Sequence, residues 1–145
     1  MTAEPRIEIV QGDITRVEAD TIVNAANTAL AEGAGVCGAI FRAAGRTELA
    51  AACRALAPCQ TGSAVVTPAF GIATAKHIIH AVGPIYSQHT PDDARELLRS
   101  AYRASIERAV QNGCRSIAFP AISTEVYGYP LEEACREAVA VCKAA

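Results

Sequence analysis

Two stretches of this chain, residues 21–38 and 116–130, each run from an apolar segment through a loop of small residues into a helix. Small residues allow backbone N–H groups to come close to a ligand, and a helix N-terminus favours negative charge. Two such loops side by side can hold a diphosphate from both sides. The pattern therefore predicts an α/β chain with an anion cradle at one edge of its sheet.

Segments with strand and helix patterns alternate along the chain. Thr90 has a capping hydroxyl and is followed by Pro91 and two aspartates, which is typical of a helix start. The expected strands are residues 6–10, 21–25, 63–67, 77–82 and 115–120. The expected helices are residues 37–44, residues 48–57, a segment from Thr90 to Asn112, and a last helix opened by Pro130. Strands that alternate with helices predict a three-layer α/β/α sandwich with a mixed central sheet.

Length and charge limit the classes of protein to consider. The 145 residues fit a single domain, residues 1–145. A net charge of −2 gives no basic surface for duplex nucleic acid, so local backbone N–H groups have to hold a small anion. No apolar run reaches the ~18 residues of a membrane helix, and the N-terminus lacks the apolar core of a signal peptide. We therefore expect a cytoplasmic monomer without membrane contact.

Cysteines and histidines give no sign of a metal site or a cofactor. The six cysteines form no C-x-x-C pair. Five are expected to be small buried hydrophobic residues: Cys53, Cys59, Cys114, Cys135 and Cys142. His77 and His80 are three positions apart on one expected strand, so they face opposite sides and one of them should be buried and hydrogen-bonded.

Gly33, Gly35 and Gly38 match the G-x-G-x-x-G pattern of dinucleotide-binding folds. That pattern requires its first glycine directly after a strand and an acidic residue about 20 positions later. Here residues 24–32 intervene, and the later position is occupied by Pro58, Cys59 and Gln60. A dinucleotide-binding Rossmann unit is therefore rejected.

Five motifs occur in a specific order: QGDI (11–14), VNAAN (23–27), GVCGAI (35–40), HAVGPIY (80–86) and AFPAISTEVYGYP (118–130). Over residues 7–143 the chain resembles the macrodomain family, most closely its MacroD-like class. The resemblance implies an α/β/α sandwich that binds ADP-ribose or an ADP-ribosylated protein, and that hydrolyses ADP-ribosyl or O-acetyl-ADP-ribose esters. It also implies a further strand and helix after residue 145, without which one sheet edge lacks its usual cover.

The resemblance also implies which residues bind the ligand. Asp13 would accept a hydrogen bond from the adenine amino group, with Ile14 beside the ring, whereas the residues alone favour Asp13 as the cap of a turn. Asn27 would contact the distal ribose and position the substrate, and Asn24 would be more structural. The alternative is that both asparagines satisfy loop backbone groups. The diphosphate and distal ribose would be enclosed by Gly33, Gly35, Val36, Ser123, Thr124, Glu125, Val126 and Tyr127.

Cys37 departs from the family pattern at a catalytic position. It stands ten residues after Asn27, where hydrolytic relatives place an aspartate that orients or activates a water. A neutral thiol accepts hydrogen bonds weakly, and losing a general base lowers rates by about 10²–10⁴-fold. A helix N-terminus can lower a thiol pKa, so a catalytic thiolate at Cys37 stays as the alternative.

Glu125 replaces a glycine that relatives carry in the second diphosphate loop. A carboxylate about 5 Å from a phosphate costs roughly 3 kcal/mol per charge pair at an effective dielectric constant of about 20. This corresponds to about a hundredfold in affinity. If the side chain turns into solvent instead, screening reduces the penalty to a few tenths of a kcal/mol.

Three functions follow from these residues. The first is a MacroD-like hydrolase in which Asn27 positions the substrate and a water is held near Cys37. The second is an ADP-ribose reader without catalysis. The third is a degenerate domain that has lost its ligand and serves as an interaction module, in which Glu125→Gly should restore binding.

Overall fold

The computed structural model describes residues 6–145 and shows a four-stranded sheet between two layers of helices. In the sheet order β2-β3-β1-β4, β1 is parallel to β3 and β4, and β2 is antiparallel to β3. The elements are η1 (Ile14–Arg16), β1 (Thr21–Ala26), α1 (Gly35–Ala44), α2 (Arg46–Leu56), β2 (Ala64–Pro68), β3 (His77–Val82), η2 (Tyr86–Gln88), α3 (Pro91–Gln111), β4 (Ile117–Ala118) and α4 (Leu131–Ala144).

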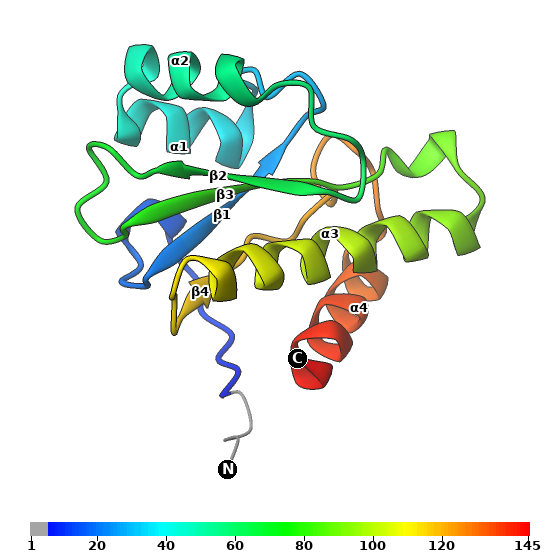
Figure 1. Cartoon of the computed structure of the whole chain (residues 1–145). Coiled ribbons are helices and arrows are strands. Elements are labelled where there is room, and N and C mark those ends of the chain that lie inside the picture. The colour runs from blue at the N-terminus through cyan, green and yellow to red at the C-terminus, as the bar shows by residue number, and fades with distance from the viewer. Residues whose placement is uncertain (1–5) are drawn as a thin grey trace.

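Helices cover both faces of the sheet, with α1 and α2 on one face and α3 and α4 on the other (Figure 1). The strands supply apolar side chains to both layers in turn, as a strand buried on two sides must. Ile22 and Ile78 pack in the core under α1 and α2, whereas Val23 and Ile79 pack in the core under α3. The predicted three-layer α/β/α sandwich with a mixed sheet is confirmed.

Residues 6–10 do not form the predicted strand. They are assigned to no strand and are exposed, and Ile9 shows 91% of its surface to solvent. A strand forms only where a neighbour pairs with its backbone N–H and C=O groups. The described sheet ends at β4, which is itself shorter than predicted and pairs with β1 only through Ile117 and Ala118. The alternating pattern of residues 6–10 therefore has no partner strand.

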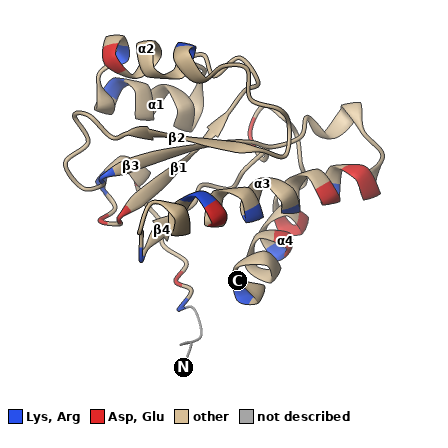
Figure 2. Ribbon diagram, in the orientation of Figure 1, with Lys and Arg blue, Asp and Glu red and all other residues tan. Residues whose placement is uncertain are grey.

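Charged side chains lie on the helices and connecting segments, and the four strands carry none (Figure 2). Lys and Arg are interspersed with Asp and Glu along α3 and α4. Within residues 6–145, no helix combines the length and apolar character needed to cross a bilayer.

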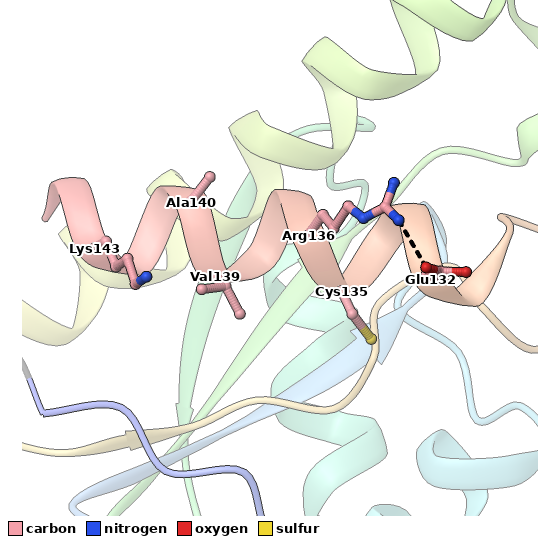
Figure 3. Close-up of a pocket in the computed structure, with 6 residues that line it drawn as sticks. All are labelled: Glu132, Cys135, Arg136, Val139, Ala140 and Lys143. Carbon is pink, nitrogen blue, oxygen red and sulfur yellow. Dashed lines mark hydrogen bonds and ion pairs between the residues drawn. The ribbon is translucent and has the colours of Figure 1, made fainter.

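An open groove of about 530 Å³ runs along α4 (Figure 3). Cys135, Val139 and Ala140 line it, together with the polar residues Glu132, Arg136 and Lys143. Cys135 is exposed there because it lies on a face of α4 turned away from the buried Ala134, so the prediction of burial is wrong for this cysteine. Cys53 and Cys59 are buried as predicted, and Cys114 and Cys142 are half-buried.

Candidate functional site

The two loops predicted to form the anion cradle start at the same edge of the sheet. The first loop, residues 27–34, follows β1 and leads into α1, and the second loop, residues 119–130, follows β4 and leads into α4. Because β1 and β4 are adjacent and parallel, their carboxyl ends lie together. The second loop passes beside the tip of β1 in Figure 1.

Two glycines show that the loops touch. A Cβ added at Gly35 would overlap Glu125 Oε2 and lie 2.9 Å from Glu125 Cδ, and the φ of Gly35 is +60°. A Cβ added at Gly83, just after β3, would overlap Ser123 Oγ and lie 3.4 Å from Ser123 Cβ. Side chains of the second loop therefore lie directly against the start of α1 and the end of β3. The sequence prediction that the two loops converge is confirmed.

Asn27 fixes the shape of the first loop. Its Nδ2 donates to the backbone oxygen of Ala31 at 3.0 Å, and its Oδ1 accepts from the backbone N–H of Ala31 at 3.0 Å. The backbone N–H of Leu30, whose φ is +54°, donates to Asn27 O. Asn27 is half-buried, and its side chain satisfies loop backbone groups, which is the alternative role that its residue type predicts. A contact with a ribose stays a prediction.

Cys37 lies in the first turn of α1 and is 5% exposed. Its Sγ lies 3.6 Å from Asn24 Nδ2, which donates to it, and 3.7 Å from Ala31 O, to which the thiol donates. Burial raises the pKa of the thiol, and the Asn24 donor only partly opposes this. The thiol is therefore neutral near pH 7, and the first turn of α1 contains no carboxylate.

Behind Cys37, a chain of hydrogen bonds crosses the sheet from β1 to β2. Asn24 Nδ2 lies 3.1 Å from His80 Nδ1, and His80 Nε2 lies 2.9 Å from Thr67 Oγ1. Burial lowers the pKa of His80 to about 4, so its ring is neutral at pH 7. With Nδ1 accepting from Asn24, the proton is on Nε2 and is donated to Thr67, whose hydroxyl donates to Pro68 O.

This arrangement places Asn24 in the interior. The residue is 1% exposed, its Nδ2 serves both His80 and Cys37, and its Oδ1 has no partner among the described residues. Asn24 thus does not reach solvent. Its burial and its contacts with His80 and Cys37 indicate a structural role, and they do not favour direct contact with a ligand. The spacing of the histidines correctly predicted that one is buried, and His80 opens the HAVGPIY motif, but nothing in the sequence predicted its contacts with Asn24 and Thr67.

Backbone hydrogen bonds hold the second loop at both ends. The N–H of Tyr86 donates to Tyr127 O at 2.9 Å, and the N–H of Tyr129 donates to Ser123 O at 2.9 Å. Thr124 Oγ1 donates to Ala121 O at 2.7 Å. Ser123 is buried with a φ of +69°, and its Oγ has no partner among the described residues. A strained residue with an unpaired hydroxyl is typical of a functional loop.

Two further predicted residues of the second loop, Val126 and Tyr127, differ in exposure. Val126 is 84% exposed, whereas Tyr127 is half-buried. Burial raises the pKa of Tyr127, and the Cys37 thiol adds to the shift.

The η1 turn packs against α1, with Ile14 as its first residue and Asp13 directly before it. Asp13 caps η1: its carboxylate accepts from Thr15 N at 2.9 Å and from Thr15 Oγ1 at 2.7 Å, which lowers its pKa. Its carboxylate remains exposed, and Ile14 is half-buried against the core. Asp13 thus has the capping role that its residue type favours, and an adenine contact stays a prediction.

Comparison with known proteins decides the family. A family model described as Macro domain matches residues 23–138. The chain belongs to the macrodomain family. This macrodomain is 54% identical over 134 residues to a macro domain-containing protein of Mesorhizobium japonicum, covering 92% of this chain and 74% of that protein. It is 51% identical over 138 residues to a Salmonella typhimurium protein named O-acetyl-ADP-ribose deacetylase, covering 92% and 75% of the two chains.

Solved structures give the same family. A macrodomain of Oceanobacillus iheyensis with ADP superposes with a TM-score of 0.87 at 42% identity, covering 92% of this chain and 73% of that chain. A Trypanosoma brucei macrodomain in complex with ADP-ribose has a TM-score of 0.83 at 41% identity, covering 92% and 54% of the two chains.

The chemistry available to this macrodomain is that of backbone amides and neutral polar groups. The first N–H groups of α1 have no partner within the helix. Gly33 precedes them in the first loop, and the half-buried Val36 lies in the first turn of α1. Among residues 6–145, no three His, Cys, Asp or Glu side chains lie close enough together to hold a metal ion. Glu125 is the one charged side chain that the second loop places over the start of α1.

Proposed function

We propose that this macrodomain binds ADP-ribose, free or attached to a protein, between the first and second loops. The observation that carries the proposal is that the second loop lies against the start of α1 at Gly35–Glu125 and against the end of β3 at Gly83–Ser123. Convergent small-residue loops at a helix N-terminus are suited to a diphosphate. Relatives in complex with ADP and ADP-ribose, at 42% and 41% identity, support the same ligand.

In the proposed complex, the diphosphate lies along the start of α1, where unpaired N–H groups and the helix dipole favour negative charge. Asp13 and Ile14 receive the adenine, and Asn27 and Tyr127 lie on the side of the distal ribose. With a net charge of −2, the attraction of an anion to this site has to come from local N–H groups and not from the overall charge of the protein. A cytoplasmic monomer stays a prediction.

We place binding before catalysis in this proposal. A general base must accept a proton near neutral pH, whereas the Cys37 thiol is buried, neutral and donates to Ala31 O. Deacetylase and glycohydrolase are the names of relatives at 51% and 46% identity. Cys37 lowers the expected rate of such a reaction in this chain by about 10²–10⁴-fold relative to a carboxylate at the same place.

Isothermal titration calorimetry with ADP-ribose tests the proposal. We expect saturable heat from the wild-type protein, and a flat titration at millimolar ligand would reject binding. Release of ADP-ribose from a mono-ADP-ribosylated protein tests catalysis on the same preparation. We expect little release by the wild-type protein and a clear gain with Cys37→Asp, whose carboxylate would receive the Asn24 Nδ2 donor that now serves the thiol.

A further inference from the structure

The exposed Glu125 side chain extends between the two loops, across the start of α1. Its carboxylate lies against the Cα of Gly35, the first residue of α1. Among residues 6–145, no hydrogen bond or ion pair is formed by this carboxylate, although the residue is exposed. The position is therefore set by the backbone that carries Glu125 and by the space available, and no polar partner holds the side chain there.

The backbone around Glu125 is fixed more firmly than its side chain. Glu125 O accepts from the N–H of Gly128 at 3.1 Å, and the bonds of Ser123 O with Tyr129 N and of Tyr127 O with Tyr86 N lie on either side. Moving the carboxylate away from Gly35 by a loop movement would break these bonds. Rotation about the side-chain torsions breaks none of them, and rotamer changes of exposed side chains occur in picoseconds to nanoseconds.

A diphosphate bound along the start of α1 would meet this carboxylate directly. Both groups are anions, and both are attracted to the same unpaired N–H groups. The ligand must therefore push the Glu125 side chain aside or accept a like charge at close range. The cost depends on the charge of the ligand, because a neutral nucleoside creates no repulsion with the carboxylate.

We infer that Glu125 sets the affinity of the diphosphate subsite: its carboxylate gates the space between the loops and weakens, without preventing, the binding of the ADP-ribose diphosphate. This inference rests on the proposed ADP-ribose site and adds the charge selectivity of that site. The gate therefore lowers the affinity for ADP-ribose and leaves the affinity for a neutral nucleoside unchanged.

The test compares Glu125→Gln, which keeps the size of the side chain and removes its charge, with the wild-type protein. Calorimetry is carried out with ADP-ribose and with adenosine, at low and at high salt. We expect Glu125→Gln to bind ADP-ribose about 10- to 100-fold more tightly at low salt. The advantage should shrink to about threefold or less near 1 M salt, where charges are screened within about 3 Å. Adenosine affinity should change by less than about twofold, since adenosine is neutral.

Glu107→Gln is the matched control, because Glu107 is an exposed glutamate on α3, on the opposite face of the sheet. It should leave both affinities unchanged. Equal ADP-ribose affinity for Glu125→Gln and the wild type would overturn the gate, and so would an equal gain for adenosine. A gain with Glu125→Ala but not with Glu125→Gln would show a steric block and also overturn it. Failure of every variant to bind ADP-ribose at either salt would instead reject the proposed function.

Discussion

Asn24 Nδ2 lies 3.1 Å from Nδ1 of His80, its register partner across the β1–β3 pair, and His80 is fully buried. The same amide donates to Cys37 Sγ at 3.6 Å. A neutral imidazole in the core thus helps to orient a side chain that contacts the candidate site. The protonation state of His80 therefore bears on folding and on the geometry around Cys37.

Stability should fall with acid because of His80. Burial lowers its folded-state pKa from 6.5 to about 4, so between these values the unfolded chain binds a proton that the folded chain does not. The full free energy of unfolding is therefore present above pH 6.5. As the pH falls from 6.5 toward 4, protonation of His80 in the unfolded chain lowers this free energy by about 3 kcal/mol in total. Urea unfolding at a series of pH values measures it.

Two variants identify the titrating group. His80→Gln should flatten the slope of the free energy of unfolding between pH 4 and pH 6.5, whatever its effect on absolute stability. His89→Gln removes a histidine outside the core and should keep the slope. If the slope persists unchanged in His80→Gln, another group is responsible and the buried neutral imidazole is the wrong explanation.

Gly35→Ala should be destabilising for two separable reasons. Alanine at a φ of +60° costs about 1–2 kcal/mol, and the added Cβ would overlap the Glu125 carboxylate. The exposed Glu125 side chain can rotate away from the added Cβ, so the backbone cost should dominate and the two substitutions should couple by no more than about 0.5 kcal/mol in denaturant unfolding. A clearly larger coupling would show that Glu125 is held in place against Gly35.

Gly113→Ala is the control for this double-mutant cycle of Gly35 and Glu125. Gly113 has a similar φ of +71°, but a Cβ added there meets nothing within 4 Å. Its cost should therefore be the backbone strain alone and should be the same with Glu125 and with Ala at position 125, within the ~0.5 kcal/mol expected for independent sites.

The cysteines should react with iodoacetamide in an order set by burial. Cys135 is exposed in the α4 groove, whereas Cys37 is 5% exposed and burial raises its pKa, so less of it is thiolate at pH 8. We expect Cys135 to be labelled at least about tenfold faster, as peptide mass spectrometry can follow. Labelling under denaturing conditions should remove the difference, and early native labelling of Cys37 would instead indicate a reactive thiolate.

Local chemistry allowed most of the fold to be predicted. The Thr90 hydroxyl does accept from Asp93 N, and α3 begins at Pro91, because caps and proline act within one turn. The strand at residues 77–82 matches its predicted bounds, since a continuous apolar run is typical of a strand buried on both faces. Residues 6–10 have an equally clear pattern, but strand formation needs a partner, and a partner is not a local property.

The candidate site was predictable in outline and not in its contacts. Small residues after β1 and before α4 indicated where two loops would meet, because parallel strands end at one edge. The direction of the Glu125 side chain depends on torsions that its residue type leaves free. The bonds of Asn27 with Ala31, and the donation from Asn24 to Cys37, depend on how the first loop folds back on itself.

Hydrogen bonds fix the backbone of both loops, and this affects the entropy cost of binding a nucleotide. Asn27 ties the first loop to Ala31, and Tyr86 ties the second loop through Tyr127 O, so the backbone is ordered before any nucleotide arrives. A preorganised receptor loses little conformational entropy on encounter. Nucleotide binding should then resemble rigid-body association. Its heat capacity change should reflect only the apolar surface buried by the ligand, without a contribution from folding of the loops.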